Sequence, residues 1–318
     1  MIESAGGSSP GPKVLLLYHH NPTTTAAYLE GALQERAQLT TAGEGQEVAL
    51  SRTARVSLPR LLDRLGTRFD LILEVEGENV DTEGHEELDV PCAWWAIDSH
   101  LHMSYDRHFF KARVYDHIFV AQKHHVARYQ DWAWTSSSWL PLAADPSVFR
   151  PEPAELSFDV GFVGSALPGL HDARRGLLKR ILRRFDRVLI ARGAFRRDAA
   201  RELSRCRLVF NRSLHRDVNM RVYEAMACGR PLLTDRLPDE CGLEAVARDG
   251  ETAFLYDDVT LEDTIASLLE DEERLDRVAQ AGRDCILAAH SYEHRVHEIL
   301  RVLGLDSVVP ERGSGAES

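Results

Sequence analysis

Short apolar runs alternate with amphipathic segments along nearly the whole chain, and this alternation restricts the fold more than any other feature of the sequence. In the first half, KVLLLYH (13–19) and FDLILEVE (69–76) read as buried strands, and LPRLLDRLG (58–66) has helical spacing. The second half repeats the pattern with the strand FDVGFVGS (158–165) and the helix HDARRGLLKRILRRF (171–185). Strands that alternate with helices predict α/β domains built on doubly wound parallel sheets.

A proline-containing stretch, DPSVFRPEPAELS (145–157), divides the two halves and predicts a stiff linker. We therefore expect two Rossmann-like domains that face each other across a cleft, with ligands beyond the carboxyl ends of the strands. The first domain is predicted over 13–150 and the second over 151–306, which includes two long amphipathic helices, 261–290 and 291–304. The Gly/Ser-rich ends, 1–12 and 307–318, are predicted to be disordered tails.

Composition narrows the range of partners. The net charge of −12 argues against a nucleic acid or an anionic membrane as the main partner. The five cysteines are dispersed and none is paired at metal-ligand spacing, which is typical of reduced cysteines in a cytoplasmic protein. Neither a secretory signal nor an apolar run of about 20 residues is found, so we expect a cytoplasmic protein without a transmembrane segment.

The most informative stretch is NMRVYEAMACGRPLLTD (219–235), which predicts a short helix followed directly by a strand. Asn219 is a candidate N-cap, so that free N–H groups would point into the cleft. Glu224 follows about 7–8 Å further along the helix, roughly the distance from a diphosphate to the ribose hydroxyls of a nucleotide. A carboxylate can accept both hydroxyl hydrogens. The spacing alone leaves a second interpretation open, in which Arg221 and Glu224 form a pair on a solvated face.

Other residues of the second half could extend such a site. Gly164 and Ser165 end the strand FDVGFVGS, where a glycine lets backbone N–H groups approach a phosphate, although glycine is also common at this kind of turn. His215, Arg216 and Arg221 add donors near the helix start.

The motifs DVGFVGS, RLVFNRSLHRDVNMRVYEAMACGRPLLTD, GETAFLYDD and HSYEHRVHEIL occur in this order. Together they resemble the nucleotide-sugar-binding half of GT-B glycosyltransferases, and most of all the group related to the spore maturation protein CgeB. The resemblance implies that Glu224 holds the ribose of a nucleoside diphosphate sugar, the donor substrate, and that no cofactor or metal ion is needed. It implies a donor site with the residues Gly164, Ser165, Asn211, His215, Arg216, Asn219, Met220, Arg221 and Glu224. It also implies that the last helix crosses back to the first domain.

One position departs from the family pattern. Many retaining relatives carry a second Glu eight residues before the ribose Glu, and here that position is Arg216. The donor sugar and the stereochemical outcome therefore stay open. As a cation, Arg216 is instead a candidate for stabilising the leaving diphosphate, against the alternative of an ordinary surface arginine.

The first half has an unusual strand end, WWAIDSHLHMSYDRHFF (94–110). Asp98 and His100 are the candidate catalytic residues, because a carboxylate or an imidazole at this edge can take a proton from an acceptor hydroxyl. The alternative is that both only cap the next segment. A metal site formed by His100 and His102 is less favoured, because no soft ligands lie nearby in the sequence. Further acceptor-side candidates are His19, His20, Asn21 and His102.

These residues predict a glycosyltransferase that moves a sugar from a nucleoside diphosphate sugar to an acceptor, which could be a metabolite, a glycan or a protein. Two alternatives share the predicted architecture, a nucleotide-sugar epimerase and a non-catalytic nucleotide-sugar-binding protein. The cluster at Asp98 and His100 favours an enzyme. The 219–224 block is equally compatible with all three.

Overall fold

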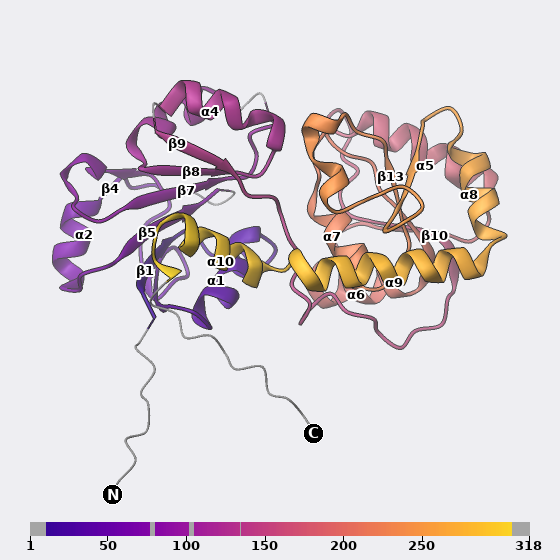
Figure 1. Cartoon of the computed structure of the whole chain (residues 1–318), viewed down its shortest axis with the longest axis horizontal. Helices are drawn as coiled ribbons and strands as arrows, with labels where there is room; N and C mark the ends of the chain where they lie inside the picture. The colour runs from indigo at the N-terminus through magenta and orange to yellow at the C-terminus, as the bar shows by residue number, and fades with distance from the viewer. Residues whose placement is uncertain (1–10, 77–79, 102–104, 134, 307–318) are drawn as a thin grey trace, which may run out of the picture.

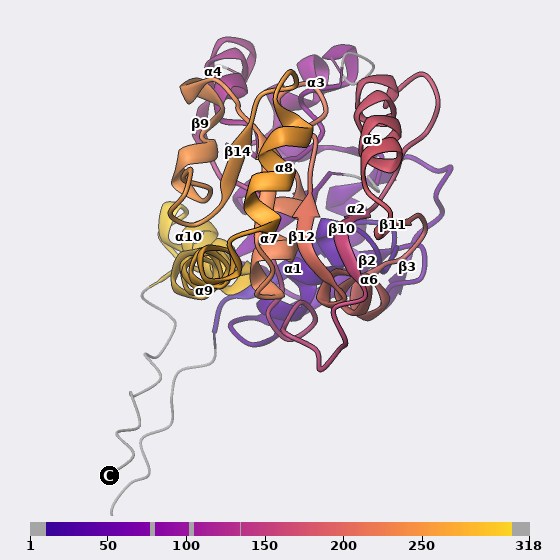
Figure 2. The same ribbon diagram turned by 90° about the vertical axis from the view of Figure 1, so that its right-hand side faces the viewer.

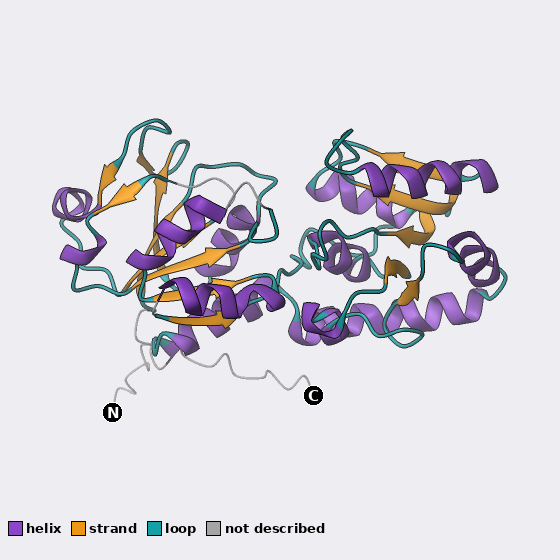
Figure 3. Ribbon diagram, turned by 90° about the horizontal axis from the view of Figure 1, so that it is seen from above, coloured by secondary structure: helices purple, strands orange, loops and turns teal. Residues whose placement is uncertain are grey.

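A computed structural model describes residues 11–76, 80–101, 105–133 and 135–306. Apart from Gly11 and Pro12, the two expected tails lie outside the described residues. The described chain forms two α/β domains, each with helices on both sides of a central sheet (Figures 1 and 3).

The first domain is built on a seven-stranded sheet in which all neighbouring strands are parallel. The strands lie in the order β3 (Val48–Ala49), β2 (Gln38–Gly43), β1 (Lys13–Leu17), β5 (Leu71–Val75), β7 (Cys92–Ala96), β8 (His117–Val120) and β9 (Ser136–Trp139). Its helices are α1 (Thr25–Gln34), α2 (Leu58–Leu65), α3 (Tyr105–Lys111) and α4 (Val126–Ala133). A small separate sheet pairs β4 (Val56–Ser57) with β6 (Thr82–Glu83).

The second domain has a five-stranded parallel sheet. Its strands lie in the order β11 (Val188–Ala191), β10 (Phe158–Val163), β12 (Cys206–Phe210), β13 (Leu232–Asp235) and β14 (Phe254–Tyr256). Its helices are α5 (Asp172–Arg184), α6 (Arg196–Ser204), α7 (Met220–Ala227), α8 (Leu261–Leu269) and α9 (Glu272–Ala289). Figure 2 shows this domain from its outer side, with α9 seen end-on.

Apolar side chains on both faces of the strands explain why helices cover both sides of each sheet. Trp94 and Trp95 are neighbours in β7, so their side chains point to opposite faces, and both have no exposed surface. In β10, Val160 and Phe162 pack on one face of the sheet and Val163 on the other. The predicted doubly wound architecture is confirmed.

The chain crosses back to the first domain at its end. Helix α10 (Tyr292–Val302) follows α9 and packs against α1 of the first domain (Figure 1). Tyr292 stacks on Tyr28 of α1 with 5.4 Å between ring centroids. The buried guanidinium of Arg295 donates to the carbonyl oxygens of Pro141 (2.7 Å) and Leu142 (2.9 Å). The crossing implied by the resemblance is therefore present.

Two features of the structure differ from what the sequence predicts. No strand is predicted over QLTTAG, yet this segment forms β2, which pairs with β1 on the side away from β5. The helix expected over 261–290 is two helices, because the side chain of Asp271 accepts a hydrogen bond from the backbone of Arg274 and starts α9.

No described helix is long and apolar enough to span a bilayer.

Candidate active site between the two domains

A cavity of about 380 Å³ lies between the two domains, at the carboxyl ends of strands from both sheets. The first domain lines it with the start of α1 and with the segments that follow β5 and β7. The second domain contributes the segments after β10, β11 and β12 and one face of α7. The cavity therefore lies where ligands bind in open α/β sheets.

Helix α7 presents Glu224 to this cavity. Among the described residues, its carboxylate has no hydrogen-bond or ion-pair partner. Burial raises the pKa of Glu224 to about 7, and Arg221 only partly offsets the rise. The alternative pair of Arg221 with Glu224 is not formed, because the Arg221 guanidinium instead donates to the carbonyl oxygen of Val163 and to Oδ1 of Asn211 (2.7 Å). A partly buried carboxylate without a partner is a candidate ligand-binding group.

Arg221 ties α7 to the loop after β10. Its guanidinium lies over the ring of Phe162, 4.4 Å from the centroid, and against Gly164. A β-carbon at Gly164 would lie 2.0 Å from Nη2 of Arg221, and the φ of Gly164 is +139°. Only glycine therefore allows this close approach of guanidinium and backbone. Gly164 and Ser165 both line the cavity, as expected for a phosphate-binding turn.

A second guanidinium, that of Arg174 in the first turn of α5, is buried and lines the same part of the cavity. It donates to the carbonyl oxygen of Ser165 (2.8 Å) and twice to that of Arg212 (2.6 and 3.1 Å). Arg174 thereby connects the loop after β10 with the loop after β12 and places a positive charge behind both. This role could not be predicted from the sequence, because an arginine in a helix rich in basic residues carries no distinguishing signal.

Asn219 and Met220 also line the cavity at the start of α7. The backbone of Asn219 is extended, as expected for an N-cap, but its side chain does not cap the helix. Its Oδ1 and Nδ2 are buried and have no hydrogen-bond partner among the described residues.

Three predicted donor residues lie outside the cavity lining. Asn211 is buried behind it, where it donates to Thr234 and accepts from Arg221. His215 and Arg216 adopt left-handed backbone angles, with φ of 49° and 65°. These angles direct the exposed Arg216 toward Glu240 (3.4 Å), away from the cavity. The position that many relatives fill with an acid is therefore not at the cavity here, and its neighbour Asp217 lines the cavity instead.

On the first domain, Asp98 and His100 both line the cavity, as predicted. The Asp98 carboxylate is partly buried and has no hydrogen-bond partner among the described residues. Burial raises the pKa of Asp98 to about 6, and the nearby carboxylates of Glu76 and Asp217 add to the rise. His100 is buried, and its Nδ1 has no hydrogen-bond partner within the described chain.

The other acceptor-side predictions have different outcomes. Nδ1 of the buried His19 accepts a hydrogen bond from the backbone of Glu44 (2.9 Å). The side chain of Asn21 accepts from the backbone and hydroxyl of Thr23 and forms the turn before α1. His19, His20 and Asn21 do not line the cavity; the loop reaches it through the next residues, Thr23, Thr24 and Thr25. His102 lies outside the described residues.

Contacts between the domains border the cavity. Nε2 of Gln122 donates to Oδ1 of Asp217 across the domain boundary (2.8 Å), and Arg196 donates to the carbonyl oxygen of Pro22 (3.0 Å). Glu76, which also lines the cavity, was missed by sequence analysis. Its place could have been predicted, since Glu76 is an acidic residue at the carboxyl end of the predicted strand FDLILEVE.

Residues 162–301 match the protein family described as Glycosyl transferase-like. Among solved structures, HepE of Anabaena with UDP and glucose has a TM-score of 0.64 at 16% identity, over 92% of this chain and 99% of that one. Sucrose-phosphate synthase of Thermosynechococcus elongatus has a TM-score of 0.62 at 12% identity, over 92% and 98%. A glycosyltransferase of Rickettsia africae has a TM-score of 0.59 at 6% identity, over 95% and 100%. No curated protein matches the sequence.

At identities this low, the structural matches show only that the fold is shared. The family match additionally identifies the second domain as glycosyl transferase-like. The chain therefore has the GT-B fold, and its second domain matches the Glycosyl transferase-like family over residues 162–301.

Proposed function

We propose that the protein transfers a glycosyl group from a uridine diphosphate sugar to an acceptor nucleophile such as a hydroxyl group, without a metal ion. The observation that carries this proposal is the unpartnered Glu224 carboxylate, which faces the interdomain cavity from α7 beside two guanidinium groups. The choice of nucleotide follows the structural neighbour HepE, whose crystal structures contain UDP or UDP-glucose.

In this proposal the second domain binds the donor. Glu224 accepts hydrogen bonds from the ribose hydroxyls, which replace the water that its carboxylate has lost by burial. Arg174, Arg221 and the N–H groups at the start of α7 attract the diphosphate. Arg216 makes no contact of this kind, because its side chain turns to Glu240.

The first domain supplies the acceptor side. Asp98 is the preferred base, because its carboxylate faces the cavity and has a pKa of about 6, close to neutral pH. The guanidinium groups of Arg174 and Arg221 stabilise the negative charge of the departing diphosphate. In this proposal, closure of the two domains around the bound substrates excludes water from the reacting sugar.

Within the same proposal we assign the chain to the CgeB-related group, because of the NMRVYEAMACG block, and to the cytoplasm. All five cysteines are unpaired, which supports this location.

A thermal-shift assay with UDP, GDP and dTDP tests the donor site. A ligand at a hundred times its Kd adds about 2.7 kcal/mol to the free energy of unfolding. UDP should therefore raise the melting temperature of the protein clearly more than GDP or dTDP does. Glu224→Ala should abolish this shift without loss of the fold. Glu240→Ala is the matched control, because Glu240 is exposed and lies outside the cavity lining. An unchanged UDP affinity in Glu224→Ala would contradict the proposal that Glu224 binds the ribose hydroxyls.

A further inference from the structure

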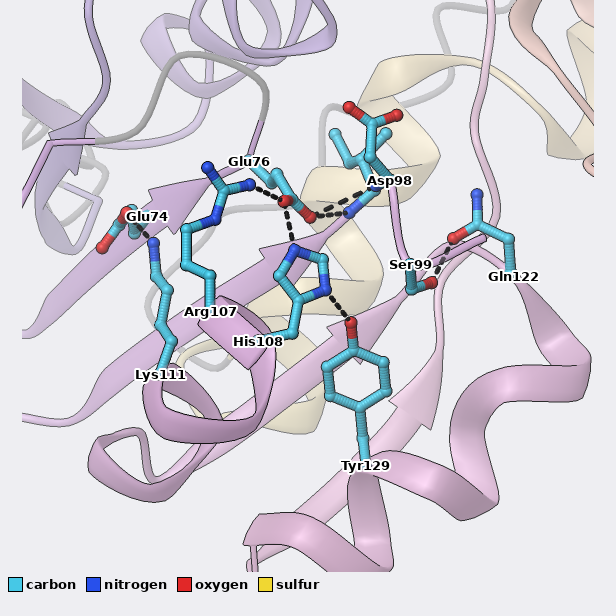
Figure 4. Close-up of polar contacts among 10 residues, drawn as sticks. Glu74, Glu76, Asp98, Ser99, Arg107, His108, Lys111, Gln122 and Tyr129 are labelled. Carbon is cyan, nitrogen blue, oxygen red and sulfur yellow. Dashed lines mark hydrogen bonds and ion pairs between the residues drawn. The ribbon is translucent and has the colours of Figure 1, made fainter. Parts of the chain in front are cut away.

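A buried polar cluster lies directly behind Asp98, and it is centred on Glu76 (Figure 4). Glu76 follows β5, has 1% of its surface exposed, and lines the cavity next to Asp98. Two carboxylates thus share one edge of the acceptor side, but their surroundings differ. Glu76 is surrounded by donors, whereas the carboxylate of Asp98 has none among the described residues.

One oxygen of Glu76 fixes the backbone at the exit of β7. Oε2 accepts hydrogen bonds from the N–H groups of Ile97 (3.0 Å) and Asp98 (3.2 Å). Figure 4 shows these bonds at the backbone of Asp98, with its carboxylate pointing the other way. Because Glu76 holds this peptide, it sets the direction in which the Asp98 side chain leaves the strand.

The other oxygen of Glu76 is held from helix α3. Oε1 accepts from Nη2 of Arg107 (2.7 Å) and pairs with Nε2 of His108. His108 is fully buried; its Nδ1 contacts the hydroxyl of Tyr129 (2.6 Å), and its ring packs edge-on against Trp94. Glu76 is therefore fixed at both oxygens, and hydrogen bonds and charge pairing from His108, followed by the charges of Lys111 and Arg107, keep its pKa below the usual range despite its burial.

We propose that Glu76 is a positioning residue for Asp98, holding it so that its carboxylate faces the cavity and receives the proton of the acceptor. This inference rests on the proposed function. In the transfer step, the acceptor hydroxyl gives its proton to Asp98 as its oxygen bonds to the anomeric carbon of the sugar. The bond between that carbon and the diphosphate breaks, and its electron pair leaves with the diphosphate.

The charges around Asp98 make this role measurable. Glu76 and Asp217 face it with negative charge and raise its pKa, whereas His100 and His108 lower it. Removal of the Glu76 charge should therefore lower the pKa of Asp98. Loss of a buried carboxylate that does not face Asp98 would lower stability without this change.

The matched control is two residues earlier in the sequence, inside β5. Glu74 is as buried as Glu76 and is also held from the α3 side, by Lys111 and Tyr115, but it has no hydrogen bond to the 97–98 backbone. Glu74→Gln and Glu76→Gln thus both remove a buried carboxylate that is paired with a cation of α3. Only Glu76→Gln removes one that contacts Asp98.

The experiment follows the carboxyl carbon-13 signal of Asp98 from pH 4 to 8 in the full chain, with Asp98→Asn to assign it. Glu76→Gln should shift the titration midpoint down by about one pH unit, and Glu74→Gln should leave it in place. The acid limb of slow UDP-glucose hydrolysis, with water as acceptor, should move with the midpoint. An unmoved midpoint in Glu76→Gln, or equal shifts in both variants, would overturn the proposal.

If Glu76→Gln does not fold, Arg107→Met provides the opposite test. Arg107 is exposed and balances Glu76, so its loss should move the Asp98 midpoint upward. A downward shift or no shift would overturn the inference. Thermal stabilisation of the wild-type protein by UDP tests the proposed function separately. If UDP gives no stabilisation while the midpoint shifts as expected, the donor assignment fails and the positioning role of Glu76 stands.

Discussion

Glu224 makes donor binding dependent on pH at the scale of a single residue. Its pKa is about 7 in the unliganded protein, because burial disfavours the charged form. In the proposed complex, hydroxyl hydrogens favour the ionised form, so binding should be strongest above pH 7 and weaken as the pH falls through this value. The affinity for UDP-glucose should decrease about tenfold between pH 8 and pH 6.

Isothermal titration calorimetry with UDP-glucose checks this expectation. UDP-glucose is preferable to UDP here, because each of its phosphates has one ester and one anhydride bond, so neither titrates over this range. Glu224→Gln should bind more weakly at pH 8 and lose most of the pH dependence. A wild-type affinity that is constant from pH 6 to 8 would show that Glu224 is not the titrating contact.

Some individual residues of the site could be predicted from the sequence, and others could not. Asp98 was a candidate because it stands at a strand end, whereas Glu224 became one through the resemblance of the block NMRVYEAMACG to a known family. Arg216 and Arg174 could not be assigned in this way. The left-handed backbone at Arg216 turns its side chain outward, and the contacts of Arg174 with two loops exist only in the folded chain.

At the scale of elements, the turn between β10 and α5 depends on Gly164. In Gly164→Ala, the new β-carbon would collide with the Arg221 guanidinium, and the backbone would have to keep a φ of +139° that alanine disfavours. We expect at least a tenfold loss of UDP-glucose affinity, about 1.4 kcal/mol, measured by calorimetry. Gly176→Ala in α5 is the control, since within the described chain its added β-carbon has no neighbour within 4 Å apart from the adjacent residues and the backbone of its own helix. It should keep full affinity and stabilise the fold by about 0.5–1 kcal/mol.

Many elements were predictable from periodicity, and two of those that were not have clear local reasons. Strand β2 lies next to β1 but near the edge of the sheet, so its outer residues, such as Gln38 and Thr40, stay polar and hide the strand pattern. The break between α8 and α9 depends on the single N-cap bond of Asp271 within a continuous amphipathic stretch. Pattern alone cannot reveal such a break.

At the scale of the whole molecule, α10 belongs to the second half of the sequence but packs on the first domain. It therefore links the two domains. The buried Arg295 fixes α10 in this position, because its guanidinium donates to the carbonyl oxygens of Pro141, Leu142 and Ala289. Arg295→Met would leave these carbonyls without their donor. We expect the free energy of unfolding to fall by about 2–4 kcal/mol.

Hydrogen exchange measured by mass spectrometry can locate this loss. In Arg295→Met, amides of α10 and α1 should exchange faster, whereas those of α5 in the outer part of the second domain should keep their protection. Arg301→Met on the same helix is the control, because Arg301 is exposed and its ion pair within the described residues is with Glu298, and it should leave exchange unchanged. Uniformly faster exchange in both domains would mean that Arg295 stabilises the chain in general. Selective loss at α10 and α1 would show that the link between the domains rests on this helix.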